Sequence, residues 1–363
     1  MARTNTAETP LSIHQALRLL PKAELHLHLG GAVAADTFVE LAALNGVSLP
    51  AFDTPADLYD YDDLGAFLEV YTLVSASVIS RSDFQRVTYE CLERCARSGA
   101  RHVELFFSPE SHLPHGVSYG TMLGGVTSGL RDAELDFGLT ASLIPAINRE
   151  LGGKRAVEFV EMIQQSRTDD VVGVGLDFNE VGFPADGFVA AFDLAGSFGL
   201  RRTSHAGEVG PAKNIRDGIE LLGCDRIDHG YNIVTDGDLM SSCARDGIPF
   251  TVCPTTTTFT SDFRDLADPD HAIRRMFDRG LTMTVNSDDP PMFGVELVDE
   301  YVTMHDVMGF GFDDLVELAM NGIDVAWVDD ATKRDWRRVW TADLESIRHR
   351  LRADEPEASL GTP

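Results

Sequence analysis

The sequence predicts an α/β fold, namely a (β/α)8 TIM barrel with extra helices after strand 1. Two observations predict it: short apolar or β-branched runs alternate with segments of helical apolar spacing, and each run ends abruptly at polar or ionisable residues. The eight runs are Ala23–Leu29, His102–Ser108, Leu139–Pro145, Val171–Phe178, Leu200–His205, Arg226–His229, Pro249–Pro254 and Leu281–Asn286. Because the carboxyl ends of parallel strands converge at one face of a closed barrel, these polar residues are expected to meet.

The segments between the runs supply the helices of the predicted barrel. Helical apolar spacing covers Ser82–Ser98, Gly153–Gln165, Asp186–Phe198 and Ile215–Leu222. The segment from residue 32 to about residue 81 is too long for one crossover, so it is expected to form extra helices that partly cover the mouth of the barrel. An open, doubly wound sheet would show the same alternation, but histidines and aspartates collect at the ends of the runs, which favours the barrel.

The length of 363 residues suits a single barrel domain, which we expect over residues 11–352. Residues 1–10 and 353–363 are expected to be flexible ends, because both segments are rich in small and polar residues.

Charge and cysteine content restrict the partners of the chain. With a net charge of −28, the protein would be repelled by nucleic-acid phosphates and by an anionic membrane surface, so neither is expected as a partner. The five cysteines are scattered without a C-x-x-C pair, which indicates neither a disulfide framework nor a thiolate zinc site. No signal-peptide pattern and no apolar run of about 18 residues occur, so a cytoplasmic location is expected. The oligomeric state stays open, and a homo-oligomer is one alternative.

Two histidines in the first run have the spacing of metal ligands. His26 and His28 lie two residues apart, and the period of a strand points both imidazoles to the same side, here the barrel interior. Two neutral imidazoles there can bind a divalent metal ion, whereas without one each would need its own hydrogen-bond partner. An isolated H-x-H pattern is equally typical of ordinary strand histidines, so this prediction depends on the other clusters.

A histidine and a glutamate follow the fifth run in the sequence HAGE. His205 can complete a set of three imidazoles, and the small Ala206 and Gly207 turn the chain so that Glu208 can project into the same pocket. A carboxylate beside a metal ion can exchange protons with a substrate. The alternative for Glu208 is an ordinary carboxylate on a surface loop.

Two further clusters end the sixth and eighth runs. A histidine that is not a ligand can hold a metal-bound water for attack, which makes His229 the candidate for that role; its alternative is a capping histidine. The adjacent Asp288 and Asp289 repel each other unless a cation lies beside them. One of them is therefore expected to bind the metal and the other to accept a hydrogen bond from substrate. The alternative for this pair is a helix N-cap before proline.

Together these clusters predict a catalytic metal site. Three histidines and one aspartate leave an open coordination position, as in catalytic rather than structural zinc sites. Because all ligands are nitrogen or oxygen, one Zn2+ per subunit is predicted, although iron, cobalt or manganese can occupy such a site. Zinc lowers the pKa of bound water toward about 7 and so supplies a nucleophile at neutral pH.

In this order and at these strand ends, the clusters resemble those of the adenosine and adenine deaminase family. The resemblance runs from about Leu19 to Thr341 and rests on the stretches PKAELHLHL, HAGE, RIDHG and NSDDP. It implies a zinc-dependent hydrolysis that converts a 6-aminopurine (adenosine, adenine or a modified adenine nucleoside) to the 6-oxopurine with release of ammonia. It also implies these roles: metal ligands His26, His28, His205 and Asp288; protonation of purine N1 by Glu208; orientation of the nucleophile by His229; binding of N7 by Asp289.

The chain departs from the family pattern at Gly30, where relatives usually carry an acid that reaches the sugar in nucleoside-using enzymes. Glycine removes a charge-assisted hydrogen bond worth roughly 1.5–3 kcal/mol and is expected to leave room for a substrate larger than adenosine. The stretch VGVGLDFNEVG lacks the glycine-acid-glutamate pattern of adenosine enzymes and, with HAGEVGP and RIDHG, favours the adenine-deaminase branch. Within that stretch, Glu180 is assigned to the substrate pocket together with Gly30.

Two other functions stay open at this point. One is a metal hydrolase of another aminated heterocycle or of an amide, because the metal ligands alone do not choose the substrate. The other is a non-catalytic purine-binding protein that keeps the barrel. Retention of all four ligands together with Glu208 and His229 favours an enzyme.

Overall fold

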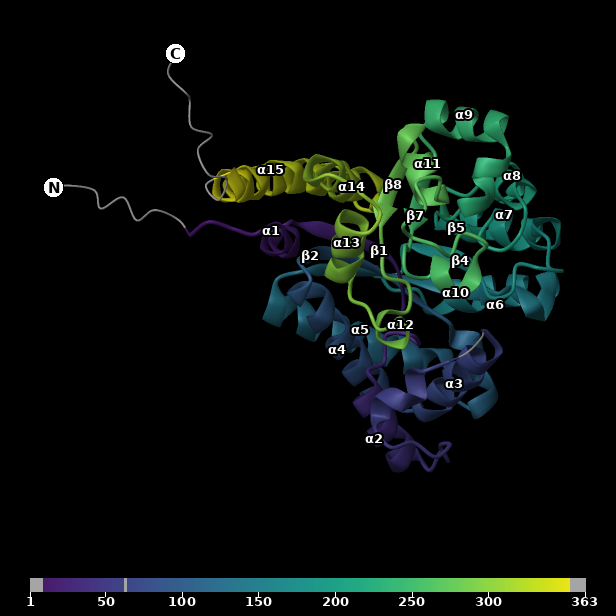
Figure 1. Cartoon of the computed structure of the whole chain (residues 1–363). Coiled ribbons are helices and arrows are strands. Elements are labelled where there is room, and N and C mark those ends of the chain that lie inside the picture. Colours follow the sequence, from purple (N-terminus) through teal and green to yellow (C-terminus); the bar gives the residue numbers. More distant parts are fainter. Residues whose placement is uncertain (1–8, 62–63, 353–363) are drawn as a thin grey trace, which may run out of the picture.

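Eight parallel strands form the centre of the molecule in the computed structural model, which describes residues 9–61 and 64–352 (Figure 1). The strands are β1 (Lys22–His28), β2 (Ala100–Phe107), β3 (Thr140–Asn148), β4 (Gly173–Asp177), β5 (Arg201–Ala206), β6 (Arg226–His229), β7 (Pro249–Val252) and β8 (Thr282–Val285). Each strand lies beside the next one in the sequence. Every predicted run overlaps one strand, so the predicted (β/α)8 barrel is confirmed.

The segment after β8 closes the sheet onto β1. The backbone N–H of His28 donates to the carbonyl of Asp288 at 2.8 Å, and the N–H of Asp288 donates to the carbonyl of His26 at 3.1 Å. The side chain of Asn286 accepts a hydrogen bond from the N–H of Leu25 at 2.8 Å. Closure of the barrel therefore places Asp288 directly beside the two histidines of β1.

Helices connect consecutive strands around the outside of the barrel. They include α4 (Arg81–Arg97), α5 (Tyr119–Phe137), α6 (Gly152–Ser166), α7 (Val189–Ser197), α8 (Ala212–Glu220), α9 (Gly237–Asp246) and α11 (Ala272–Asp278). The four helices expected from apolar spacing correspond to α4, α6, α7 and α8.

Helix α5 was not predicted, because four glycines lower its helical propensity. Two of these glycines let α5 lie very close to α4. A Cβ at Gly129 would come within 2.6 Å of the carbonyl oxygen of Gln85, and one at Gly125 would come within 2.6 Å of the Cβ of Phe84. Close packing of two helices thus requires residues that weaken helix formation in the isolated segment.

Extra helices follow strand 1, as predicted. They are α2 (Ala35–Asn45), the 3-10 turn η1 (Pro55–Tyr59) and α3 (Leu64–Ser77). Helices α2 and α3 lie together at one end of the barrel (Figure 1). The ring of Phe67 on α3 stacks on Phe293 of α12 (Pro290–Phe293), the short helix after β8, with centroids 5.3 Å apart. This stacking holds α3 across the mouth, where the carboxyl ends of the strands meet.

The last helices pack beside the start of the barrel. Helix α14 (Phe312–Val325) packs against β1 and β8, and helix α15 (Asp330–Arg352) lies beside it and projects from the barrel (Figure 1). Trp340 of α15 and Ile323 of α14 are buried in one cluster with Leu25 of β1. Of the two predicted flexible ends, residues 1–8 and 353–363 lie outside the described residues.

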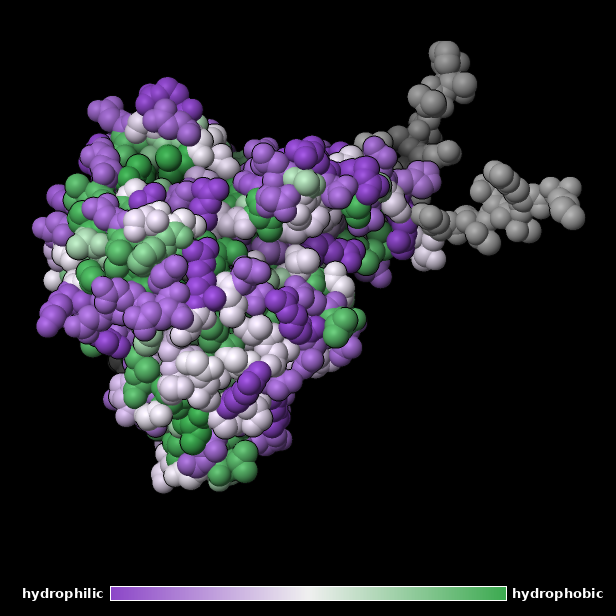
Figure 2. All heavy atoms as spheres, turned by 180° about the vertical axis from the view of Figure 1, so that it is seen from behind, coloured by the Kyte–Doolittle hydropathy of each residue, from purple (hydrophilic) through white to green (hydrophobic). Residues whose placement is uncertain are grey.

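The surface is mixed in character. Figure 2 shows hydrophilic residues around scattered apolar ones over the face opposite to that of Figure 1. Isolated apolar residues of this kind are normal on a protein surface. Among the described residues, no helix combines the length and the apolar character needed to cross a membrane.

Candidate functional site

Four buried side chains point their donor atoms at one place inside the barrel. The Nε2 atoms of His26 and His28 on β1 lie 3.3 Å apart, and Nε2 of His205 on β5 lies 3.1 Å from each of them. The Oδ1 atom of Asp288 lies 3.3 Å from Nε2 of both β1 histidines. The structure thus brings together the four residues that the sequence assigned as ligands.

These separations suit four donor atoms that bind one small metal ion. Donor atoms about 2.0–2.1 Å from one zinc ion lie roughly 3 Å from one another, and four of them leave a position for a water because zinc can become five-coordinate. A looser combination with His229 in place of His28 also has all donor atoms within 4.8 Å. We favour the set with His28, because its atoms already have the separations of bound ligands and because both ring nitrogens of His229 face other partners.

The second ring nitrogen of each of the three histidines faces a side-chain oxygen. Nδ1 of His26 lies 3.0 Å from Oγ1 of Thr251, and Nδ1 of His205 lies 3.5 Å from Oδ2 of Asp228. Nδ1 of His28 lies 3.8 Å from a carboxylate oxygen of Asp177. Such partners keep the ring proton on Nδ1 and so leave Nε2 free to bind a metal ion.

The charge of this cluster also favours a cation. Burial disfavours a charge on His26, but the Asp288 carboxylate raises its pKa to about 9. Burial lowers the pKa of His28 to about 4, so a proton is held beside Asp288 by one imidazole and not by the other. A divalent ion would replace this proton and use neutral imidazoles as ligands. The residues present therefore fit a divalent metal.

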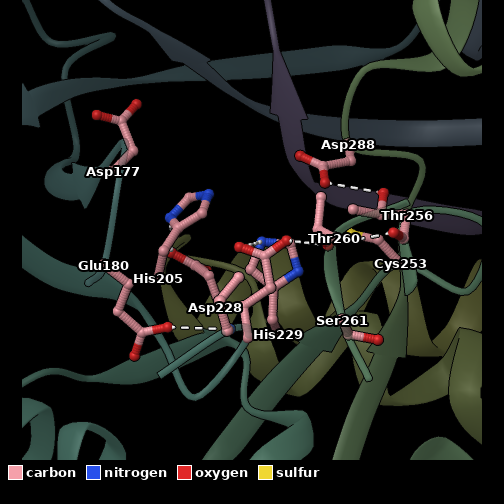
Figure 3. Close-up of polar contacts among 12 residues, drawn as sticks. Asp177, Glu180, His205, Asp228, His229, Cys253, Thr256, Thr260, Ser261 and Asp288 are labelled. Carbon is pink, nitrogen blue, oxygen red and sulfur yellow. Dashed lines mark hydrogen bonds and ion pairs between the residues drawn. The ribbon is translucent and has the colours of Figure 1, made fainter. Parts of the chain in front are cut away.

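Asp288 is fixed by its backbone and by a threonine. Its φ of 63° lies in the left-handed region, which non-glycine residues rarely adopt. The hydroxyl of Thr256 donates to its Oδ2 at 2.9 Å and leaves Oδ1 facing the histidines (Figure 3). Strained backbone of this kind concentrates at functional sites, and His229 and Phe178 are the other non-glycine residues of the described chain that show it.

His229 is held as a neutral imidazole. The hydroxyl of Tyr231 donates to the carbonyl of Cys253 at 3.1 Å, so its oxygen accepts from Nδ1 of His229, also at 3.1 Å. This contact assigns the ring proton to Nδ1 and leaves the lone pair on Nε2. Burial lowers the pKa of His229 to about 4, so it is uncharged at neutral pH. Its Nε2 is therefore an acceptor that can receive a proton or a hydrogen bond.

Glu208 carries a titratable proton near neutral pH. Its Oε1 accepts a hydrogen bond from the hydroxyl of Thr260, and its Oε2 lies 3.6 Å from Nε2 of His229. Burial, reinforced by the negative charge of Asp288, raises the pKa of Glu208 to about 7. At that pKa the carboxyl group both donates and accepts a proton readily at neutral pH.

Glu180 binds the loop that carries Glu208. Its carboxylate accepts hydrogen bonds from the backbone N–H groups of Gly207 at 2.6 Å and Gly210 at 2.8 Å, and from the side chain of Asn214 at 2.8 Å. Figure 3 shows Glu180 on the opposite side of His205 from His229. Glu180 lines the cavity, as expected, but these contacts make it a positioning residue for the Glu208 loop.

Asp289 lies against the end of β1 with an unsatisfied oxygen. Any Cβ at Gly31 would overlap its carboxyl group, so only glycine admits Asp289 to this position. Within the described residues, its buried Oδ1 has no hydrogen-bond partner. Burial and the neighbouring Asp288 raise its pKa well above the usual range. A protonated Asp289 can thus donate a hydrogen bond to a ligand, whereas the sequence led us to expect that it accepts one.

The space expected beside Gly30 is filled. A Cβ at Gly30 would lie 2.5 Å from the phenol oxygen of Tyr71 and 2.6 Å from its Cζ. Tyr71 reaches this position from α3, and its ring lines the cavity. The expectation that glycine leaves room for a larger substrate on this side is therefore wrong, because an aromatic side chain from another element occupies the room.

The cavity in front of the four donor atoms has a volume of about 260 Å3. This is just below the range of about 300–1,000 Å3 that is typical of small-molecule sites, so it suits a small heterocycle. Its aromatic wall consists of Phe67, Tyr71, Phe178 and Phe293, and its polar wall includes Glu208 and Asp289.

Sequence reasoning missed three residues of this region. Asp177 ends β4 and lines the cavity, Tyr71 fills the place beside Gly30, and the buried Arg149 donates to the carbonyls of His205 at 2.6 Å and Asp177 at 3.0 Å. Asp177 had a signal, since it is ionisable and stands at the end of a predicted strand. Tyr71 and Arg149 had none, because only the fold brings them to the site.

The chain is similar in sequence to known proteins. The family model described as adenosine deaminase matches residues 21–339. An adenine deaminase from Vibrio parahaemolyticus is 34% identical over 321 residues, which cover 88% of this chain and 94% of that protein.

Two solved structures are similar in fold and sequence. An amidohydrolase from Burkholderia ambifaria with bound Zn is 35% identical, with a TM-score of 0.89 over 96% of this chain and 98% of that one. An adenine deaminase from Arthrobacter aurescens is 33% identical, with a TM-score of 0.83 over 91% of this chain and 99% of that one.

Proposed function

Because the chain belongs to the adenosine deaminase family, we propose that it is an enzyme that removes the 6-amino group of a purine by hydrolysis, with adenine as its substrate. The products are the 6-oxopurine and ammonia. The observation that carries the proposal is the cluster of three imidazoles and one carboxylate facing a small cavity that also holds Glu208. The similarity to proteins named adenine deaminase supports adenine over adenosine.

We propose zinc as the metal and His26, His28, His205 and Asp288 as its ligands. Nitrogen and oxygen donors separated by 3.1–3.3 Å suit this ion. When bound, the metal supplies Lewis acidity, which lowers the pKa of water and makes it nucleophilic near neutral pH. The bound Zn in the Burkholderia ambifaria amidohydrolase supports the choice for this chain.

The remaining residues position the purine and move its protons. Glu208, with a pKa of about 7, donates a proton to N1, which makes C6 more electrophilic. Nε2 of His229 accepts a hydrogen bond from the attacking water and directs it at C6. Protonated Asp289 donates to N7, an acceptor, which fixes the ring in the cavity. Of the two protons of the water, one passes through Nε2 of His229 to the amino group, which leaves C6 as ammonia, and the other restores the proton of Glu208.

We also propose that residues 11–352 act as one catalytic domain. One hydrophobic core extends from Leu17 to Leu344, which supports this division. Absence of nucleic-acid and membrane partners, a cytoplasmic location and the oligomeric state remain predictions from the sequence.

A panel of amines tests the proposed function. Zinc-loaded protein is mixed with adenine, adenosine, deoxyadenosine, N6-methyladenine and an aminopterin-type pterin, and ammonia and oxopurine are quantified. We expect equimolar ammonia and hypoxanthine from adenine, with the highest kcat/KM of the panel. A higher kcat/KM for the pterin would show that the substrate is another aminated heterocycle and not a purine. No turnover on any compound by fully metallated protein would favour a non-catalytic binding protein.

The pH profile is expected to report on Glu208. Its protonated form donates to N1, and since the raised pKa is about 7, this form is present below that pH and lost as the pH rises through it. The positive charge of a bound metal ion favours the carboxylate and so lowers this pKa from about 7. We expect kcat/KM to fall about tenfold per pH unit on the alkaline side, with an apparent pKa at or below about 7. A flat profile from pH 6 to 9 would remove Glu208 as the proton donor.

Gly31→Ala is expected to weaken substrate positioning by displacing Asp289. Loss of one buried hydrogen bond of about 1.5 kcal/mol corresponds to a drop of about tenfold in kcat/KM for adenine. Gly120→Ala is the matched control, because its Cβ meets nothing within 4 Å on α5. Equal kcat/KM values for adenine in Gly31→Ala and Gly120→Ala would show that the position of Asp289 has no effect on substrate binding or turnover.

A further inference from the structure

A small group of polar side chains lies beside His28, and apart from the contact of Asp177 with that histidine it takes no part in the steps described so far. Tyr71 comes from α3, Ser108 from the end of β2 and Asp177 from the end of β4. Tyr71 and Asp177 line the cavity. Ser108 is buried and contacts both of them. We name these three residues the Tyr71–Asp177 subsite.

The contacts within the subsite form a short chain. The hydroxyl of Ser108 donates to Oδ2 of Asp177 at 3.3 Å, and the side chains of Ser108 and Tyr71 form a hydrogen bond. The same Oδ2 lies 3.8 Å from Nδ1 of His28. With Nε2 of His28 assigned to the metal, the ring proton sits on Nδ1 and also points at Asp177. Both neighbours of Oδ2 are therefore donors, so Oδ2 is an acceptor. Burial raises the pKa of Asp177 to about 8, but Arg149 and the hydrogen bond from Ser108 act against this and favour the carboxylate.

The other oxygen of Asp177 is unused. Asp177 is only 4% exposed, and its buried Oδ1 has no hydrogen-bond partner within the described residues. An acceptor buried without a partner is costly unless a ligand supplies the missing donor. Figure 3 shows Asp177 on the opposite side of His205 from His229, away from the groups assigned to the reacting carbon.

Gly30 explains how the subsite is assembled. A Cβ at residue 30 would lie 2.5 Å from the phenol oxygen of Tyr71 and 2.9 Å from its Cε2, closer than real Cβ contacts allow. Any side chain at this position would therefore push the Tyr71 phenol away from Ser108. The absence of a side chain at residue 30 is what admits the phenol to the subsite.

We propose that the Tyr71–Asp177 subsite binds an N–H or O–H donor at the end of the substrate remote from C6, and that Gly30 is required to place Tyr71 in it. On a purine this donor is either the ring N9–H of a free base or a hydroxyl of a sugar on N9. The subsite thus discriminates between substrates by their N9 end. This inference rests on the proposed purine deamination.

Three ligands separate the two sources of the donor. Adenine carries N9–H, adenosine carries sugar hydroxyls, and 9-methyladenine carries neither. In the wild type, we expect kcat/KM to be at least about tenfold higher for the donor-bearing substrate than for 9-methyladenine. Asp177→Ala is expected to abolish this ratio, and Asp177→Asn to retain part of it because the amide oxygen still accepts. If Asp177→Ala lowers kcat/KM for adenine alone, the donor is the ring N9–H. If it lowers kcat/KM for adenosine alone, the donor is a sugar hydroxyl.

Two readouts distinguish substrate recognition from support of His28. Metal content is measured for each variant, and binding of hypoxanthine, inosine and 9-methylhypoxanthine is measured by calorimetry. We expect full metal content in Asp177→Ala and a selective loss of binding for the ligand that carries the donor, hypoxanthine or inosine. An equal loss for all ligands, or a loss of metal, would overturn the subsite and leave Asp177 as a support of the metal site. Calorimetry also separates failure of the subsite from failure of the proposed reaction, because it needs no turnover.

A double-mutant cycle tests the part played by Gly30. Gly30→Ala and Tyr71→Ala are each expected to lower the preference for the donor-bearing ligand, and the double variant should be no worse than Tyr71→Ala. Tyr71→Phe, which keeps the ring, checks the hydroxyl if the alanine variant folds poorly. Gly120→Ala serves as the control with open space around its Cβ. The proposed role of Gly30 would be contradicted if Gly30→Ala kept the wild-type preference, or if the losses of preference in Gly30→Ala and Tyr71→Ala added up in the double variant.

Discussion

Glu208→Gln is expected to bind metal and to fold normally, yet to turn over adenine at least about 10²-fold more slowly than the wild type. Glutamine has nearly the same shape, so the hydrogen bond with Thr260 can persist. It has no acidic proton for N1, however, and the near-neutral pKa of Glu208 is lost with it. Single-turnover kinetics, metal analysis and thermal unfolding measure the three parts of this prediction.

The control for this variant is Glu161→Gln on the exposed face of α6, which removes the same charge far from the cavity. Its turnover should equal that of the wild type. Turnover of Glu208→Gln within a few-fold of the wild type would exclude Glu208 as the proton donor.

His28→Ala and His229→Ala are expected to fail in different ways. In His28→Ala the metal loses a ligand. Losing a residue that only orients a ligand lowers metal affinity by up to about 100-fold, so loss of the ligand itself should lower it by more than about 100-fold. In His229→Ala the metal should stay bound, while turnover falls at least about 10²-fold because the attacking water is no longer directed. Metal affinity by competition with a chelator and kcat at saturating metal separate the two effects.

This pair of variants also decides between the two sets of donor atoms. His115→Ala, on an exposed turn, is the control and should change neither quantity. Loss of metal from His229→Ala with full metal in His28→Ala would exchange the roles assigned to the two histidines.

The metal cluster and the barrel could be predicted because both depend on local patterns. His26 and His28 share a side through the period of a strand, and His205, His229 and Asp288 each stand at the end of a predicted strand. Convergence of those ends then follows from the closed barrel alone. The 3.1–3.3 Å separations of the donor atoms are what such convergence leads one to expect.

The wall of the cavity could not be predicted, because it depends on contacts between distant segments. Gly30 alone indicates an empty space, and only the course of α3 brings Tyr71 into it. Glu180 lines the cavity as expected, but nothing in the sequence indicated that its carboxylate also accepts hydrogen bonds from the backbone of the Glu208 loop. Helix α5 escaped prediction for a similar reason, since its glycines serve the packing against α4.

The central claim is that His26, His28, His205 and Asp288 hold one zinc ion at the mouth of the barrel. Anomalous diffraction at the zinc absorption edge from crystals of the zinc-loaded protein tests it most directly. We predict one strong peak about 2.0–2.1 Å from Nε2 of each of the three histidines and from Oδ1 of Asp288. A peak bound by His229 instead of His28, or no peak inside the barrel at full zinc occupancy in solution, would contradict the account.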